Sequence, residues 1–216
     1  MTNVIWEQIG QGTIETLQMT LASTLLAYLF GTPIGILLAV TGKGGVLEKR
    51  SVYTVVGTIV NIFRSIPFLI LLVFLIPFTR WITGSSIGTV ATIVPLTVGA
   101  IPIVARMVES SLNEVAPGII EAAMSMGASP MQVIIHFILP ETAPSLVMGI
   151  AINMVTILGY SAMAGCIGGG GLGAIALNYG YYRYQTNVLL ITIVLLIAIV
   201  QILQEIGIKV SKHIRH

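Results

Sequence analysis

The sequence is poor in charge and in the residue types that usually build active sites. Of its 216 residues only 8% are charged, none is Asp, one is Cys and three are His. A soluble domain carries about 25% charged residues, and a chain with so little charge could not keep its apolar surface from associating in water. The single Cys166 excludes an internal disulfide, and the scarcity of His, Cys and Asp argues against a metal site.

Motifs for nucleotide chemistry are missing as well. The phosphate cradle of ATP-hydrolysing proteins, GxxxxGK followed by Ser or Thr, does not occur in the sequence. Gly168, Gly170 and Gly173 fit GxGxxG, but no acidic residue follows that could hold a ribose, so we interpret them as close-packing backbone. We therefore predict no catalytic residue and no cofactor in this chain. The net charge of +2 does not favour a nucleic-acid partner.

The residues that are abundant are apolar. They make up 56% of the chain, with a mean hydropathy of +0.98. A helix needs roughly 20 apolar residues to cross the hydrocarbon of a bilayer. We predict an all-α polytopic membrane protein with a single transmembrane domain over residues 1–216, and the charge-poor stretches give its five spans as about 16–42, 51–79, 81–105, 144–163 and 184–204.

The positions of Lys and Arg predict the orientation in the membrane, because cytoplasmic loops carry an excess of both. With five spans, one side of the membrane receives Lys43, Lys49, Arg50, Arg106, Lys209, Lys212 and Arg215. The other side receives only Arg80 and Arg183, and the first 42 residues contain neither Lys nor Arg. We expect the amino terminus outside and the carboxyl terminus in the cytoplasm.

The connection between the third and fourth spans, residues 106–141, is the longest loop and carries the stretch EAAMSMGASPMQVIIHFILP. We expect a short helix with Glu121 in its first turn, where the helix dipole favours a negative charge. Gly127 is expected to end it, and Ser129 to begin a second piece that runs to Pro140. Such a half-apolar segment either packs at the membrane interface or docks to a partner.

This stretch resembles the EAA loop of ABC importer permeases. The matching residues are Glu121, Ala122, Ala123, Gly127, Leu139 and Pro140, while Phe137 stands where that family usually has Ile. Three further segments, NIFRSIPFLILL, IVPLTVGAIPIVARMVE and GYSAMAGCIGGGGLG, are similar to the methionine-uptake branch of these permeases.

The resemblance implies the type I ABC importer permease fold and a permease subunit that moves L- or D-methionine across a bacterial inner membrane by alternating access. The EAA loop would form a coupling helix in a cleft of a separate cytoplasmic ATPase subunit, which would bind the ATP and magnesium. An external substrate-binding protein or lipoprotein would deliver the substrate. We expect a homodimer embedded in lipid, because a path made of five spans fits best at a two-fold interface.

Two groups of polar residues inside the spans are candidates for the translocation path. Asn61, Ser65 and Phe68 share one helical face by spacing, with Arg64 beside it, and an intramembrane charge is costly enough to suggest function. The second group is Asn153, Thr156, Tyr160 and Met163. The alternatives are that Arg64 holds a neighbouring loop and that the second group makes hydrogen bonds between helices.

Small residues suggest further features of the bundle. Gly31 and Gly35 form GxxxG, a pattern typical of close helix packing. Pro95, Gly99 and Pro102 share a face of the third span and suit a helix that bends. Two other functions remain open: a permease for another amino acid or small osmolyte, and a stand-alone channel or secondary carrier.

Overall fold

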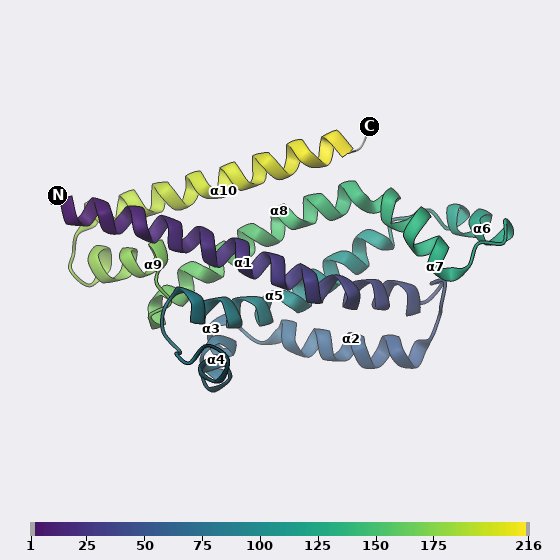
Figure 1. The fold of residues 1–216 in the computed structure, drawn as a ribbon, viewed down its shortest axis with the longest axis horizontal. Coiled ribbons are helices and arrows are strands. Elements are labelled where there is room, and N and C mark those ends of the chain that lie inside the picture. The colour runs from purple at the N-terminus through teal and green to yellow at the C-terminus, as the bar shows by residue number, and fades with distance from the viewer. Residues whose placement is uncertain (1–2, 215–216) are drawn as a thin grey trace.

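The structure, a computed structural model, describes residues 3–214, and in this range every regular element is helical (Figure 1). This confirms the predicted fold class. The α-helices are α1 (Asn3–Thr41), α2 (Arg50–Ser65), α3 (Phe68–Phe74), α4 (Ile76–Thr83), α5 (Thr89–Leu112), α6 (Pro117–Ser125), α7 (Pro130–Gln132), α8 (Leu139–Ala164), α9 (Gly171–Ile175) and α10 (Thr186–Ile214). Two π-helical turns, η1 (Val133–Ile138) and η3 (Ala176–Tyr181), and one 3-10 turn, η2 (Gly165–Ile167), complete them.

Four long helices, α1, α5, α8 and α10, run along the long axis of the molecule (Figure 1). The short helices α6 and α7 project at one end, the end at which α10 also finishes (Figure 1). The beginning of α1 and the helix α9 lie at the opposite end (Figure 1). The chain therefore starts and finishes at opposite ends of the bundle, as an odd number of crossings requires. Arg215, used above for the orientation, lies outside the described residues.

The core is built around α5, most of whose residues are buried. Gly31 and Gly35 of α1 lie directly against it, because a Cβ on Gly31 would come within 2.8 Å of Val104 and one on Gly35 within 2.6 Å of the Ala105 carbonyl oxygen. The absence of side chains at these two positions lets the backbones approach closely. The close packing suggested by GxxxG is thus confirmed.

The second predicted span is broken into pieces. Helix α2 ends at Ser65, and α3 leaves it at an angle of 98°. The break follows from Pro67, because a residue that precedes proline is pushed out of the α region, and Ile66 has φ −78° and ψ 123°. By length and composition, four helices among the described residues suit a membrane span, and α2 with α3 makes a fifth if the bent pair is one span. The count of five stays a prediction.

Other helices differ from the predicted spans at their ends. Trp81 lies in α4 rather than at the start of the third long helix, because Gly84, with φ +75°, ends α4 in a left-handed cap. Helix α5 continues to Leu112, so Arg106 lies within a helix instead of in the loop that follows. Helix α8 begins before Pro144, and α10 runs ten residues past Gln204 to Ile214.

Candidate functional site

The projecting segment of residues 117–140, here called the coupling segment, begins with α6. Pro117 occupies the first helical position, where its missing N–H is not needed. Glu121 therefore lies in the second turn of α6, and the prediction that it lies in the first turn was wrong. Glu121 and Ala122 are exposed at the end of the molecule, whereas Ala123 is fully buried in the core.

Gly127 ends α6, as predicted. Its φ of +85° is left-handed, its N–H donates to the Met124 carbonyl at 3.0 Å, and the Ala128 N–H donates to the Ala123 carbonyl at 3.1 Å. These two bonds form a Schellman cap, which favours glycine at this position. Ser129 begins the next helix through a capping box with Gln132. The reversal between the two helices is therefore specified by local chemistry.

The second piece does not stop at Pro140, which corrects the sequence prediction. Helix continues from Pro130 to Ile167 over 38 residues. Pro140 has no backbone N–H to donate to the preceding helical turn. The π turn η1 comes directly before it, and in this turn the Leu139 N–H donates to the carbonyl of Ile134, five residues back. A π turn inserts one extra residue in this way without ending the helix. Residues 130–140 are thus continuous with α8.

The coupling segment presents an apolar surface with one carboxylate. Met124, Met126, Met131 and Ile135 are all exposed, and Met126 reaches 72%. Of the matching residues, Glu121, Ala122, Gly127 and Pro140 are exposed, while Ala123 and Leu139 pack into the chain's own core. Exposed apolar patches of this kind mark interaction sites.

Three of the predicted path residues come together around one small cavity. The rings of Phe68, from α3, and Tyr160, from α8, stack with centroids 4.2 Å apart and an angle of 2° between their planes. Gly99 of α5 faces them, since a Cβ there would lie 3.2 Å from the Phe68 ring. Arg64 lines the same cavity. Residues from four helices, α2, α3, α5 and α8, thus meet around an aromatic pair, and Arg64 is among them.

Asn61 and Ser65 do not share a helical face with Phe68, because the chain bends between α2 and α3. The Asn61 amide oxygen accepts a hydrogen bond from Arg106 at 2.9 Å, and the Ser65 hydroxyl donates to the Asn61 carbonyl at 2.8 Å. Asn61 is therefore engaged in helix packing, and the single-face prediction was wrong.

The residues of the second predicted group, Asn153, Thr156, Tyr160 and Met163, have different surroundings. Asn153 is 3% exposed, and its amide donates to the Tyr28 hydroxyl of α1 at 2.9 Å. This is the hydrogen bond between helices that the sequence left as an alternative. Thr156 donates to the Ile152 carbonyl of its own helix at 3.1 Å. Met163 is exposed.

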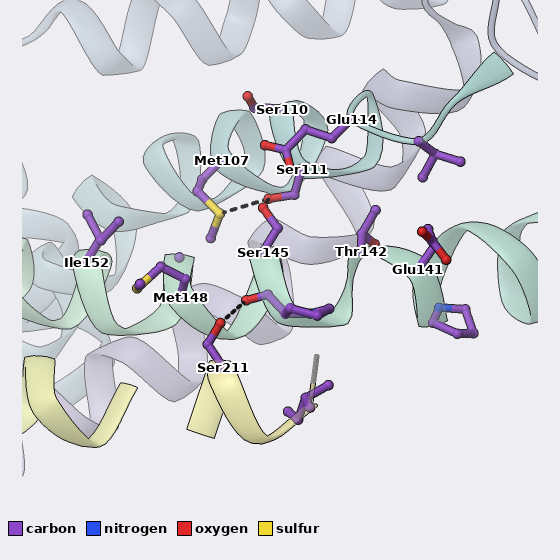
Figure 2. Close-up of a pocket in the computed structure, with 15 residues that line it drawn as sticks. Met107, Ser110, Ser111, Glu114, Glu141, Thr142, Ser145, Met148, Ile152 and Ser211 are labelled. Carbon is purple, nitrogen blue, oxygen red and sulfur yellow. Dashed lines mark hydrogen bonds between the residues drawn. The ribbon is translucent and has the colours of Figure 1, made fainter. Parts of the chain in front are cut away.

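A larger cavity of about 710 Å³ lies between α5, α8 and the last turn of α10, next to the coupling segment. Figure 2 shows side chains of α5 facing those of α8 across it, with Ser111 and Ser145 hydrogen-bonded at 2.9 Å. Ser211 of α10 donates to the Pro144 carbonyl at 2.8 Å (Figure 2). The α8 residues Ser145, Gly149 and Ile152 line the cavity.

This cavity continues a single face of α8. From Ser145, steps of four and three residues lead through Gly149 and Ile152 to Thr156 and, further on, to Met163, so these residues lie on one side of the helix. Ile152 and Met163 are exposed along it. Thr156 and Met163 were predicted from the sequence, whereas Ser145, Gly149 and Ile152 were missed because they are neither charged nor aromatic.

The glycine-rich segment at the other end is held by α1. The Glu15 carboxylate accepts a hydrogen bond from the Gly171 N–H at 2.7 Å, and the Thr16 hydroxyl accepts one from the Leu172 N–H at 2.9 Å. Glu15 therefore satisfies the first backbone N–H of α9. The interpretation of these glycines as packed backbone fits this geometry.

This arrangement is that of an all-helical membrane protein with a segment that projects from one end of the bundle. Residues 31–207 match the family described as "Binding-protein-dependent transport system inner membrane component". The chain belongs to this family.

Relatives of known name align with most or nearly all of this chain. A protein of Vibrio cholerae named "Probable D-methionine transport system permease protein MetI" is 47% identical over 204 residues, which are 94% of this chain and 91% of the relative. The Escherichia coli K12 protein named "D-methionine transport system permease protein MetI" is 53% identical over 155 residues, 72% of this chain and 71% of the relative.

Solved structures of ABC transporters contain chains with the same fold. A chain from "Inward facing conformations of the MetNI methionine ABC transporter" superimposes with a TM-score of 0.97 at 47% identity, covering 99% of both chains. A chain from an amino acid ABC transporter with histidines matches with a TM-score of 0.79 over 96% of this chain and 94% of the other. At 19% identity, the second match supports only the fold.

Proposed function

We propose that this chain is the permease subunit of an ATP-driven importer for methionine. The observation that carries the proposal is the likeness to a chain of the MetNI methionine ABC transporter along 99% of both chains, together with the exposed coupling segment at one end. The chain would contribute the route across the membrane. It would not catalyse a reaction.

The energy would come from a partner. A separate ATPase subunit would bind ATP and magnesium and would receive the exposed face of α6 in a cleft. Glu121 suits a basic or amide group of that partner, and Ala122 allows close approach of a second backbone. The buried Ala123 and the half-buried Leu139 would keep the coupling segment fixed to its own bundle.

The substrate would pass along the face of α8 that runs from the 710 Å³ cavity to Met163. Phe68 and Tyr160 would close this route, and Arg64 would attract the carboxylate of an amino acid. In a homodimer, two such faces would enclose the path. The path would open first to one side of the membrane and then to the other as the ATPase partners close and separate.

The proposed orientation places the coupling segment and the end of α10 in the cytoplasm of a bacterial cell, at the inner membrane. Lys43, Lys49, Lys209 and Lys212 lie on or beside the elements of this end, which agrees with the positive-inside rule. The amino terminus and the glycine-rich segment would face outward, where an external binding protein would deliver methionine.

Reconstitution tests the proposal. We expect vesicles that contain this chain with its ATPase and the external binding protein to take up methionine only with ATP on the ATPase side. Vesicles with this chain alone should take up none. Uptake by the chain alone would indicate a channel or secondary carrier, and uptake of another amino acid or an osmolyte in place of methionine would correct the substrate.

Arg64→Gln provides a second test. The change removes the positive charge and keeps a polar, though shorter, side chain. We expect slower uptake with normal binding of the ATPase subunit. Normal uptake would remove Arg64 from the path.

A further inference from the structure

A polar cluster at the junction of α2 and α5, here called the Arg106 clasp, consists of Arg106, Glu109, Gly57 and Asn61. One guanidinium nitrogen of Arg106 donates to the Glu109 carboxylate at 2.7 Å. The other terminal nitrogen donates to the Gly57 carbonyl at 3.0 Å and to the Asn61 amide oxygen at 2.9 Å. A single side chain therefore links two helices through three acceptors.

The clasp is buried on one side only, because Glu109 and Gly57 are buried, Arg106 is half-buried and Asn61 is exposed. Glu109 is only 6% exposed, and a buried charge is stable only when it is paired and hydrogen-bonded. Gly57 is buried, and a Cβ on it would lie 3.2 Å from the Arg106 guanidinium. The glycine thus leaves the space through which Arg106 reaches the α2 backbone.

The apolar contacts of α2 with the bundle lie on one face, where Tyr53 and Val56 pack beside Val60. Its buried residues are Gly57 and Val60, and Val60 packs against Leu38 and Ala105. The opposite side of α2 exposes large apolar residues, among them Val55 and Ile62. The clasp adds two hydrogen bonds from α5 to this apolar attachment of α2.

Helix α5 is joined just as firmly to the coupling segment. Val108 and Leu112, near its end, belong to the same core cluster as Ala123 of α6 and Val133 of η1. Arg106 lies less than two turns before the end of α5 at Leu112. A shift of α6 therefore moves the end of α5, and with it the clasp.

Combining these contacts, we infer that Arg106 is a positioning residue that transmits displacement of the coupling segment to α2, the helix that carries Arg64. The Arg106 Nε–H is buried and has no hydrogen-bond partner among residues 3–214. An unpaired buried donor is costly, so the clasp as described leaves one Arg106 donor unsatisfied. This inference rests on the proposed function.

Substitutions at Asn61 test it in vesicles that contain the complete transporter. Methionine uptake and ATP hydrolysis are measured together, so that uptake per ATP is obtained. Asn61→Leu removes the acceptor at similar volume, and loss of a hydrogen bond to a charged group should lower uptake per ATP by about tenfold. Asn61→Asp keeps an acceptor and should retain most of it. Thr58→Val, an exposed change on the same helix, is the matched control and should behave as the wild type.

Arg106→Lys is a second test by the same measurement of uptake per ATP. A lysine keeps the charge, but its ammonium lacks the planar fork that reaches Glu109 and α2 together, so uptake per ATP should again fall. Adding Asn61→Asp should restore part of the loss, because a carboxylate offers the ammonium a stronger partner. A purely structural role would instead reduce the amount of assembled transporter and lower uptake and hydrolysis in proportion.

The outcomes are distinct. Unchanged uptake per ATP in both Asn61→Leu and Arg106→Lys would overturn the inference, and so would a proportional loss of both activities. If Asn61→Leu does not assemble, Arg106→Lys with and without Asn61→Asp decides the question. Failure of the wild-type transporter to take up methionine would instead contradict the proposed function.

Discussion

The aromatic rings of Phe68 and Tyr160 stack face to face with centroids 4.2 Å apart, joining the short helix α3 to the long helix α8. The chain reaches this contact because Pro67 turns α3 away from α2 by 98°. Gly99 of α5 provides the space beneath the Phe68 ring. The pair thus depends on a proline between two helices and on a glycine and two aromatic residues from three helices, α3, α5 and α8.

Loss of either ring should open this contact. We expect Tyr160→Ala to permit ATP hydrolysis with little methionine uptake, because α3 would no longer close against α8. Tyr160→Phe keeps the ring and is the matched control, and it should transport normally. A double-mutant cycle between Phe68 and Tyr160, measured by thermal unfolding of the purified chain, should give a coupling of about 0.5–1.5 kcal/mol. Additive effects would show that the rings do not support each other.

The reversal at Gly127 should be essential for docking. A side chain at a φ of +85° costs about 1–2 kcal/mol, so Gly127→Val should distort the end of α6 and reduce co-purification of the ATPase subunit. Gly118→Ala is the control, since a Cβ there meets nothing within 4 Å. Equal recovery of the ATPase with both variants would contradict the docking assignment.

Glu121 should affect coupling rather than folding, because its side chain is exposed. We expect Glu121→Ala to weaken ATPase binding while the chain inserts and unfolds as the wild type does, which thermal unfolding in detergent would verify. Glu141→Ala, another exposed carboxylate near the coupling segment, provides the comparison. An ATPase pull-down unchanged by Glu121→Ala, with normal uptake, would place the docking contact elsewhere.

Packing of α1 on α5 should tolerate no methyl group at Gly35. Gly35→Ala would press on the Ala105 carbonyl oxygen and Val108, and overpacking of this kind typically costs about 1–3 kcal/mol. Gly10→Ala, in the same helix but facing open space, should be neutral or stabilise by about 0.5–1 kcal/mol. The two melting temperatures in detergent test this, and a Gly35→Ala variant as stable as Gly10→Ala would refute it.

The hydrogen bond between Asn153 and Tyr28 should contribute to stability and little to transport. Interhelical hydrogen bonds in membranes contribute about 0.6 kcal/mol on average. Tyr28→Phe should therefore lower the stability of the purified chain by about that amount, while methionine uptake stays near that of the wild type. A large loss of uptake would indicate that Asn153 faces the substrate.

The sequence predicts the parts of this fold that depend on local chemistry. Apolar runs of sufficient length indicated the long helices, and Gly127 and Ser129 marked the reversal in the coupling segment because capping is a local property. The ends of other helices were predicted less well, as at Arg106, which lies within α5, and at Pro140, which does not end its helix. Pro140 is normally a helix breaker, yet a π turn in front of it keeps the helix continuous.

The candidate site was harder to predict, because its residues meet only in three dimensions. Asn61 and Phe68 have the spacing of one helical face, but the bend at Pro67 separates them, and periodicity carries no information past a break. Arg106 and Glu109 are three residues apart in sequence, a spacing typical of an ion pair. That pairing was predictable, whereas their contact with α2 depends on how the helices pack.

The continuous helix from Pro130 to Ile167 connects the coupling segment with the far end of α8. Its first turns belong to the segment that would meet the ATPase, and its far portion carries Tyr160 and Met163. A displacement imposed on its first turns would reach Tyr160 and Met163 along one unbroken backbone. The ribbon changes direction between α7 and α8 (Figure 1), where the π turn and the nearby prolines favour a bend, so this bend would set the direction in which the far portion moves.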